Sequence, residues 1–280
     1  NSASRPIFDE LITYDANDNI ASFEIRQHAE DNSKHVWPQT FDIALLYADS
    51  VETISVAMQK KNIVLYEAIG KPKPNVILYN SNGMGYGVFP LNEKDLGTIP
   101  QLKNQVSRGY AYINAYENAL NGMVETSTIF ELYRESLGSE KNELLISLLS
   151  RYTTTLFWKY LTETQRTKYQ QQLSDQIWSQ LQSGLPANIK KNLFSIFRSV
   201  GYSEASRSQL YAIWNKTVVI EDLKLNEDDF TEIAMDLVLY GHPKSEKILQ
   251  EAGESISNPD KLARFKFLLP SVSKDSNIRN

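Results

Sequence analysis

The stretch Asn80–Phe89, with the sequence NSNGMGYGVF, divides this 280-residue chain into two parts with different hydrophobic patterns. Three glycines at alternate positions predict a tight turn, because glycine adopts positive φ without strain. Apolar residues recur with a period of two before this stretch, and the pattern becomes helical after Pro90 and Pro100. We therefore interpret residues 80–89 as the junction between a β module and an α module.

A Gly-x-Gly-x-Gly sequence also occurs in loops that bind phosphate. Such loops lie between a strand and a helix whose N-terminus faces the anion. Here Val88, Phe89 and Pro90 follow the glycines, which is more typical of a further strand. We therefore expect a structural turn at the junction and no phosphate site.

Short runs of alternating apolar and polar residues before the junction predict strands with one buried face. The apolar members are Phe23 and Ile25; Phe41, Ile43, Leu45 and Tyr47; Ile54, Val56 and Met58; Ile63 and Leu65; Val76 and Leu78; and, in a last strand, Tyr86 and Val88. About six strands with short connections predict a small antiparallel β-sandwich over residues 1–92.

Residues 93–280 place apolar side chains at three- and four-residue steps, the pattern of amphipathic helices. Predicted N-caps are Thr128 with Glu131, Ser139, Thr162 with Gln165, Ser203 and Asn226; Pro243 and Pro259 fit first turns, and Gly122, Gly201 and Gly241 fit helix ends. About nine helices with short connections predict an all-α antiparallel array, similar to a HEAT or armadillo superhelix.

The junction also carries apolar residues that a flexible linker would lack. We expect Phe89 and Ile99 to be buried between the two modules, which would then form a rigid unit.

Composition limits the partners and the chemistry. The net charge of −5 is spread along the chain without a basic face, so no nucleic-acid partner is expected. No apolar run approaches the ~20 residues of a membrane helix. The chain has no cysteine, which excludes disulfides, thiolate catalysis and cysteine-ligated zinc. The N-terminus has no signal-peptide pattern.

Histidines are the first candidates for a metal site. The three are His28, His35 and His242, and none begins a His-Glu-x-x-His motif. His28 and His35 flank a loop and could share a metal with Glu30 or Asp31. We favour a solvated turn there, because nothing in the sequence fixes the geometry.

An acidic cluster and a tyrosine cluster are two further candidates for a binding site. Glu221-Asp222 and Glu227-Asp228-Asp229 lack the alternate ligands and central glycine of an EF-hand, so we expect acidic residues that favour a helix N-terminus. Tyr110, Tyr112 and Tyr116 follow helical spacing without accompanying lysines or arginines, so we expect packing rather than base stacking. No Gly-x-Ser-x-Gly elbow is present. From the residues alone, no catalytic, metal-binding or cofactor-binding residue is assigned, and substrate-binding residues stay unknown.

Two segments resemble aminopeptidase-N-like zinc peptidases, the gluzincins. One is the junction Asn80–Phe89; the other is Ile248–Asp275, which contains the sequence SNPDKLARFKFLLP. Leu210–Trp214 and Leu225–Phe230 also look like the helical domain of that family. The resemblance implies the C-terminal region of such an enzyme, with a β-sandwich followed by a helical domain.

The resemblance also implies the function of the parent protein. The helical domain would cap the active-site cleft and restrict entry to peptides, while a separate catalytic domain would hold zinc and remove amino-terminal residues. This chain lacks the zinc motif, so we expect a fragment that is inactive alone and needs no cofactor of its own. Its expected partners are the parent's catalytic domain and peptide substrate, in the cytoplasm or the bacterial cell envelope.

The sequence departs from the family at two places. Gly87 and Val88 stand where the family often has Tyr-Arg, and Lys261 stands where arginine is common. The chain also ends at Asn280, where the family usually continues with more helices, so truncation is expected. The alternative function is a stand-alone helical-repeat scaffold that binds a protein or peptide. A His-Glu-x-x-His motif in the reading frame upstream of Asn1 would distinguish the two.

Overall fold

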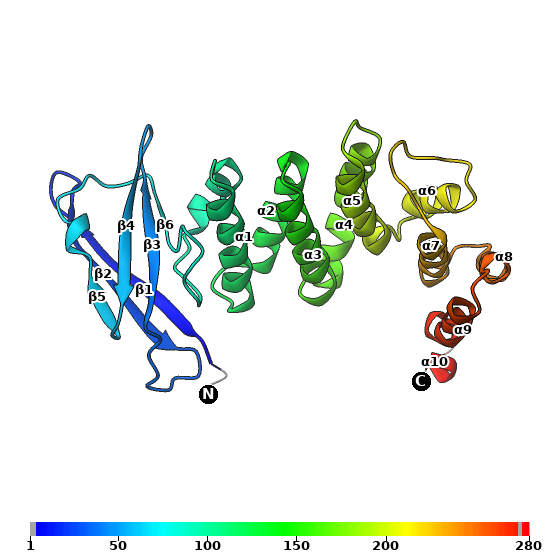
Figure 1. The fold of residues 1–280 in the computed structure, drawn as a ribbon, viewed down its shortest axis with the longest axis horizontal. Helices are drawn as coiled ribbons and strands as arrows, with labels where there is room; N and C mark the ends of the chain where they lie inside the picture. Colours follow the sequence, from blue (N-terminus) through cyan, green and yellow to red (C-terminus); the bar gives the residue numbers. More distant parts are fainter. Residues whose placement is uncertain (1–3, 274–275, 280) are drawn as a thin grey trace. The chain divides into compact units, whose positions relative to one another are not determined.

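The computed structural model describes residues 4–273 and 276–279, which form six β-strands followed by ten α-helices (Figure 1). The predicted order of β region and then α region is confirmed. Contacts divide the chain into two compact units, Asn1–Asn142 and Glu143–Asn280. The first unit holds all six strands together with the first two helices, so residues 92 and 93 both lie inside it.

The strands pair into two antiparallel sheets of three. The first sheet has the order β1–β2–β5, formed by Pro6–Tyr14, Ile20–Ala29 and Asn62–Val64. The second has the order β4–β3–β6, formed by Val51–Met58, Gln39–Leu46 and Val76–Leu78. Five of the predicted strands form, as β2 to β6, and their antiparallel pairing agrees with the sequence prediction.

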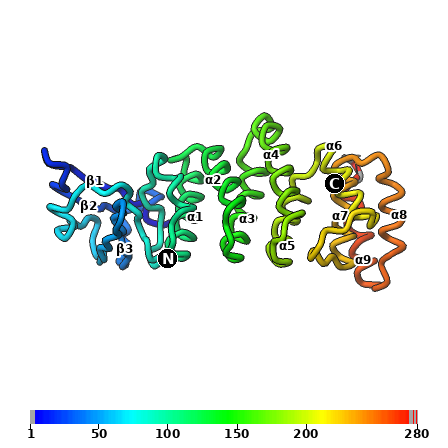
Figure 2. Tube along the Cα trace, turned by 90° about the horizontal axis from the view of Figure 1, so that it is seen from above, coloured from blue at the N-terminus to red at the C-terminus, as the bar shows by residue number. Residues whose placement is uncertain are grey.

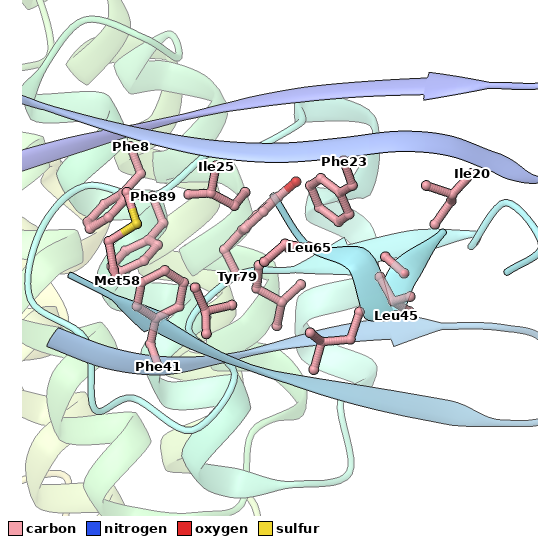
Figure 3. Close-up of a cluster of buried hydrophobic side chains, with 14 residues drawn as sticks. Phe8, Ile20, Phe23, Ile25, Phe41, Leu45, Met58, Leu65, Tyr79 and Phe89 are labelled. Carbon is pink, nitrogen blue, oxygen red and sulfur yellow. The ribbon is translucent and has the colours of Figure 1, made fainter. Parts of the chain in front are cut away.

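Side chains from both sheets meet in one hydrophobic core. Figure 3 shows Phe23 and Ile25 of one sheet facing Phe41 and Leu45 of the other, with Tyr79 and Leu65 between them. Because side chains alternate between the two faces of a strand, the core takes every second residue. The period-two pattern of the sequence has this origin.

Two strand predictions are wrong. No strand is predicted before Ile20, whereas β1 forms there; Ile7 and Phe8 are both buried, so its first residues do not alternate. The expected strand over Tyr86 and Val88 is a single parallel bridge between Val88 and Ile7. Two hydrogen bonds hold that bridge, from Phe8 N to Val88 O at 2.8 Å and from Val88 N to Pro6 O at 3.0 Å.

The predicted burial of the junction is confirmed. Phe89 is 1% exposed and belongs to the sandwich core, and Ile99 is 3% exposed. The amide of Phe89 donates to Asn114 Oδ1 at 3.0 Å, and its carbonyl accepts from Asn114 and Asn118 of helix α1 (Gln105–Leu120) at 3.1 and 3.0 Å. If these buried backbone groups had no hydrogen-bond partners, the fold would be less stable. The side chain thus joins the sandwich while the backbone joins the helix.

The helices of the first unit are α1 and α2 (Thr126–Ser139). Those of the second unit are α3 (Glu143–Lys159), α4 (Glu163–Leu181), α5 (Ala187–Val200), α6 (Glu204–Trp214), α7 (Glu227–Leu239), α8 (Ser245–Ser255), α9 (Pro259–Leu268) and α10 (Ser276–Arg279). Helix α5 packs on α3, α4 and α7, and α7 also packs on α6 and α8. Figure 2 shows α7, α8 and α9 side by side.

Several predicted caps are confirmed. Thr162 forms a capping box with Gln165, and Asn226 forms one with Asp229. Ser203 accepts from the amide of Ser206 at the start of α6. Each bond satisfies a backbone donor that the first turn of a helix leaves free.

Two predicted caps are wrong. Thr128 lies inside α2, whose N-cap is Glu125, and Ser139 is the last residue of α2. The chain turns into α3 through Glu140, whose Oε1 accepts from the amides of Lys141 and Asn142, each at 2.9 Å. The side chain of Arg108 fixes Glu140 there, with its Nε 2.8 Å from Oε2. Spacing alone did not reveal this cap, because Arg108 is 32 residues away in sequence.

Candidate functional site

The glycine-rich junction is a closed structural turn, as expected. The amide group of Asn80, which is fully buried, donates to Gly85 O at 2.9 Å and accepts from Gly85 N at 2.7 Å. A Cβ at Gly85 would lie 2.8 Å from the ring of Phe89, so no space is left beside it. The backbone donor that a phosphate would need at Gly85 is already used.

The two loop histidines do not form a metal site with Glu30 or Asp31. His28 Nδ1 lies 3.1 Å from Asp9 Oδ2, and the ring of His35 packs edge-on against Trp37. Glu30 accepts instead from Arg5, and Asp31 accepts from the backbone of Ser33. Across residues 4–273 and 276–279, no group of three or more histidine and carboxylate side chains could hold a metal ion.

The acidic cluster is used in helix capping and ion pairing. Glu227, Asp228 and Asp229 occupy the first turn of α7, where the helix dipole favours negative charge. Lys261 lies 2.8 Å from Asp228 Oδ1 and 3.8 Å from Glu227 Oε1, and Lys191 pairs with Asp229. Lys261 belongs to the Asn-Pro-Asp segment, whose Asn258 caps α9. This segment therefore ties α9 to the start of α7.

The tyrosines of α1 pack inside the first unit, as predicted. The ring of Tyr112 is fully buried and lies edge-on to Tyr133, and Tyr110 lies edge-on to Phe89. Tyr116 is also buried. These rings stabilise the helix packing and present no platform for a ligand.

Charged, hydroxyl and aromatic side chains meet in an open hollow of the second unit, which we call the Trp158 groove. It has a volume of about 570 Å³. Its lining residues are Trp158 of α3; Ser195, Arg198 and Ser199 of α5; and Glu232, Asp236, Leu239 and Tyr240 at α7. Since α5 packs against both α3 and α7, these three helices hold the groove together.

An ion-pair network forms the polar wall of the Trp158 groove. Arg198 Nε lies 2.7 Å from Asp236 Oδ2, and Arg198 Nη1 lies 2.5 Å from Glu232 Oε2. Burial raises the pKa of Asp236 to about 6, although the Arg198 guanidinium opposes the change. The Asp236 carboxyl therefore changes charge at about pH 6. The other carboxylate of the network, Glu232, lies at the surface with 59% of its side chain exposed.

The end of α5 presents its carbonyls to two aromatic donors. Tyr240 Oη donates to Arg198 O at 2.5 Å and to Ser199 O at 2.8 Å. Trp158 Nε1 donates to Ser199 O at 3.2 Å and to Ser199 Oγ at 3.0 Å. Burial raises the pKa of Tyr240, which keeps its hydroxyl protonated as a donor. These bonds satisfy carbonyls that the last turn of a helix leaves free.

The groove combines exposed apolar surface with fixed charges. Trp158 is 43% exposed and Leu239 is 57% exposed, while Arg166 lies over the Trp158 ring at 5.8 Å. Amphipathic rings of this kind are enriched where proteins bind other chains. None of the three histidines lines the groove, and of its two serines Ser199 accepts a hydrogen bond from Trp158 Nε1. Exposed apolar surface beside fixed charges suits the binding of another chain.

Sequence reasoning missed this groove. One signal was present, since Glu232, Asp236 and Tyr240 recur at four-residue steps on one face of α7. Their partner Arg198 lies 34 and 38 residues before the two acids, so only the packing of α5 on α7 brings them together. Within the described residues, no helix has the length and apolar character needed to cross a membrane.

Comparison with protein families finds no matching family, and a search of curated proteins finds no matching protein.

Proposed function

We propose that this chain is the non-catalytic C-terminal region of a zinc aminopeptidase, whose helices restrict the substrate to peptides. The observation that carries the proposal is the resemblance of Asn80–Phe89 and Ile248–Asp275 to that family, in the order of a β-sandwich and then helices. The catalytic zinc and the hydrolytic residues would belong to another region of the parent protein, in the cytoplasm or the cell envelope.

The packing of α3, α5 and α7 supports the proposed helical array. Helix α5 contacts both α3 and α7, and α4 and α6 each pack against a helix of that set. Alternating layers of this kind occur in HEAT and armadillo superhelices, and we extend the proposal to that architecture. The Trp158 groove lies on the α3–α5–α7 layer and offers apolar and hydrogen-bonding contacts to a peptide.

Metal analysis and a hydrolysis assay test the proposal. The purified chain is expected to retain no zinc after dialysis and to leave aminoacyl anilides intact. One tightly bound zinc per chain, or hydrolysis by the chain alone, would overturn it.

A second test uses the longer reading frame. A His-Glu-x-x-His motif with a downstream glutamate is expected upstream of Asn1, and a frame that begins near Asn1 would contradict the proposal. In the longer protein, Trp158→Ala should lower kcat/KM for peptides of several residues and spare an aminoacyl anilide. Tyr160→Ala is the matched control, because Tyr160 is 46% exposed and lies just after α3, outside the groove lining.

The alternative is a stand-alone scaffold that binds a protein or peptide partner, and the open Trp158 groove is the observation that favours it. In that case the isolated chain should bind peptides by itself, and Trp158→Ala should weaken the binding while Tyr160→Ala does not. The upstream reading frame distinguishes the two functions. The aminopeptidase requires a zinc motif there, and the scaffold does not.

A further inference from the structure

A second open hollow of the Glu143–Asn280 unit combines aromatic rings with carboxylates; we call it the Trp214 pocket. It has a volume of about 560 Å³. Its lining residues are Trp214, Asn215 and Lys216 after α6; Leu225, Asn226, Glu227 and Phe230 at the start of α7; and Glu251 and Ser255 of α8. No lining residue is shared with the Trp158 groove, so the two sites are separate.

A cation of the chain itself already lies on the aromatic wall of this pocket. Lys216 Nζ is 5.1 Å from the centre of the Phe230 ring. Lys216 is exposed, in a turn where its φ is +62°. Among the described residues its ammonium forms no ion pair or side-chain hydrogen bond, so the ring face is its one specific partner. An ammonium over a ring face is attracted by the negative face of the π system.

The ion pairs formed by the carboxylates of the pocket are long and accessible to solvent. Glu251 lies 3.4 Å from Lys247 on the same helix, with both side chains at least 46% exposed. Glu227 lies 3.8 Å from Lys261 and accepts a hydrogen bond from Ser257 Oγ at 3.2 Å. Exposed pairs of this length contribute little stability, so either carboxylate can accept a second cation without a large loss.

We propose that the Trp214 pocket binds the primary ammonium of a lysine-like side chain, and that Lys216 occupies its cation position when the pocket is empty. Phe230 and Trp214 contact the aliphatic stem and the ammonium, while Glu251 and Glu227 supply opposite charge. Because one ring face accommodates one ammonium, Lys216 must swing into solvent as the ligand enters. Lys216 is thus a competitor that weakens binding. This proposal is independent of the proposed aminopeptidase function.

Titration with a matched pair of probes tests it on the full chain. N-acetyl-lysine methylamide carries the ammonium, and N-acetyl-norleucine methylamide has the same stem length without charge. Chemical shifts of the Trp214 indole should move with the lysine probe and not with the norleucine probe. Equal effects of the two probes would overturn the proposal, as would tighter binding of the corresponding arginine probe.

The Lys216→Gln variant tests whether Lys216 competes with the ligand. Removing the internal competitor should tighten binding of the lysine probe by about two- to fivefold, the ratio that ~0.5–1 kcal/mol of cation–π attraction gives. Lys224→Gln is the matched control, since Lys224 is an exposed lysine of the same α6–α7 connection outside the pocket lining. If both variants changed the affinity for the lysine probe equally, only net charge would matter. That result would overturn the proposal that Lys216 competes with the ligand.

Two further variants locate the site. In the Lys216→Gln background, Glu251→Gln on the exposed face of α8 should weaken lysine-probe binding, and Phe230→Leu should remove the preference over norleucine. Thermal unfolding of each variant checks that the fold persists. If Phe230→Leu unfolds the chain, Glu251→Gln alone decides, and unchanged affinity in that variant would overturn the proposal.

Discussion

The Phe89 cluster of the first unit and the Trp158 groove of the second use similar aromatic side chains for opposite purposes. Phe89 stacks on Phe8 at 4.3 Å and lies edge-on to Phe41 at 4.9 Å, and all three rings are at most 3% exposed. Trp158 lies beside Tyr202 with almost half of its surface in water. A sealed cluster contributes stability to the fold, whereas an open one beside charged groups is available to a ligand.

The backbone around each cluster shows the same difference. Two asparagines of α1 satisfy the buried amide and carbonyl of Phe89. At the groove, the carbonyls of Arg198 and Ser199 are satisfied by the polar tips of Tyr240 and Trp158. The first arrangement would be lost only with the fold, but the second can be altered while the helices remain. The predictions below rank these effects.

Phe89→Ala is expected to produce the largest change. Removing a fully buried ring that three other aromatic rings contact should destabilise the first unit by on the order of 3 kcal/mol. Urea unfolding measures the loss, and limited proteolysis between Pro90 and Pro100 should become faster. Phe267→Ala is the control, since Phe267 is 82% exposed and should change stability by less than about 0.5 kcal/mol. Rapid cutting of the unaltered chain at this segment would contradict the sealed junction.

Gly87→Ala should have the next largest effect. Gly87 has φ +134°, and a Cβ there would lie 2.5 Å from Pro6 O, so the junction would have to move away from β1. We expect a loss of about 2 kcal/mol in unfolding free energy. Gly97→Ala is the matched control, because a Cβ at Gly97 meets no atom within 4 Å. Equal melting temperatures of the two variants would show that the Val88–Ile7 bridge adapts freely.

Asp236→Asn should reveal a pH dependence that the Phe89 cluster lacks. Burial raises the pKa of Asp236 to about 6 in the folded chain, above the ~3.9 of an unfolded aspartate. The folded state therefore binds more protons between these values, so this group's contribution is complete below about pH 4 and is lost as pH rises through 6.

Relative to the Asn variant, the unaltered chain should lose about 1–2 kcal/mol of stability between about pH 4 and 7. Denaturant unfolding at several pH values measures the difference. Asp228→Asn is a control, because Asp228 lies 59% exposed at the start of the same helix. Parallel stability curves of the unaltered chain and the Asp236 variant would contradict the burial of Asp236.

Trp158→Phe should have the smallest effect on stability. The change keeps a ring but removes the Nε1 donor to Ser199, worth about 0.5–1 kcal/mol in net stability. Thermal unfolding should shift little, while peptide affinity should fall if the groove binds peptides. A loss as large as that of Phe89→Ala would mean that the groove is part of the core.

The sequence by itself determined the order of β and α regions, the antiparallel pairing and the burial of Phe89. It also identified the caps at Thr162, Ser203 and Asn226. These features depend on periodicity or on residues within a few positions, so they can be recognised locally. Spacing also predicted acidic residues at a helix N-terminus and a structural turn at the glycines, which are the first turn of α7 and the turn closed by Asn80.

The tertiary structure alone decided the features that depend on distant partners. The first three residues of β1 are all buried, so the alternation that would identify this strand is missing there, and Val88 pairs with its edge at Ile7. Glu140 caps the turn before α3 only because Arg108 holds it there. The Trp158 groove needs α3, α5 and α7 in contact, and the raised pKa of Asp236 needs the burial that this packing creates. Propensity and spacing carry no information about such contacts, because burial and electrostatic coupling arise only when the helices pack.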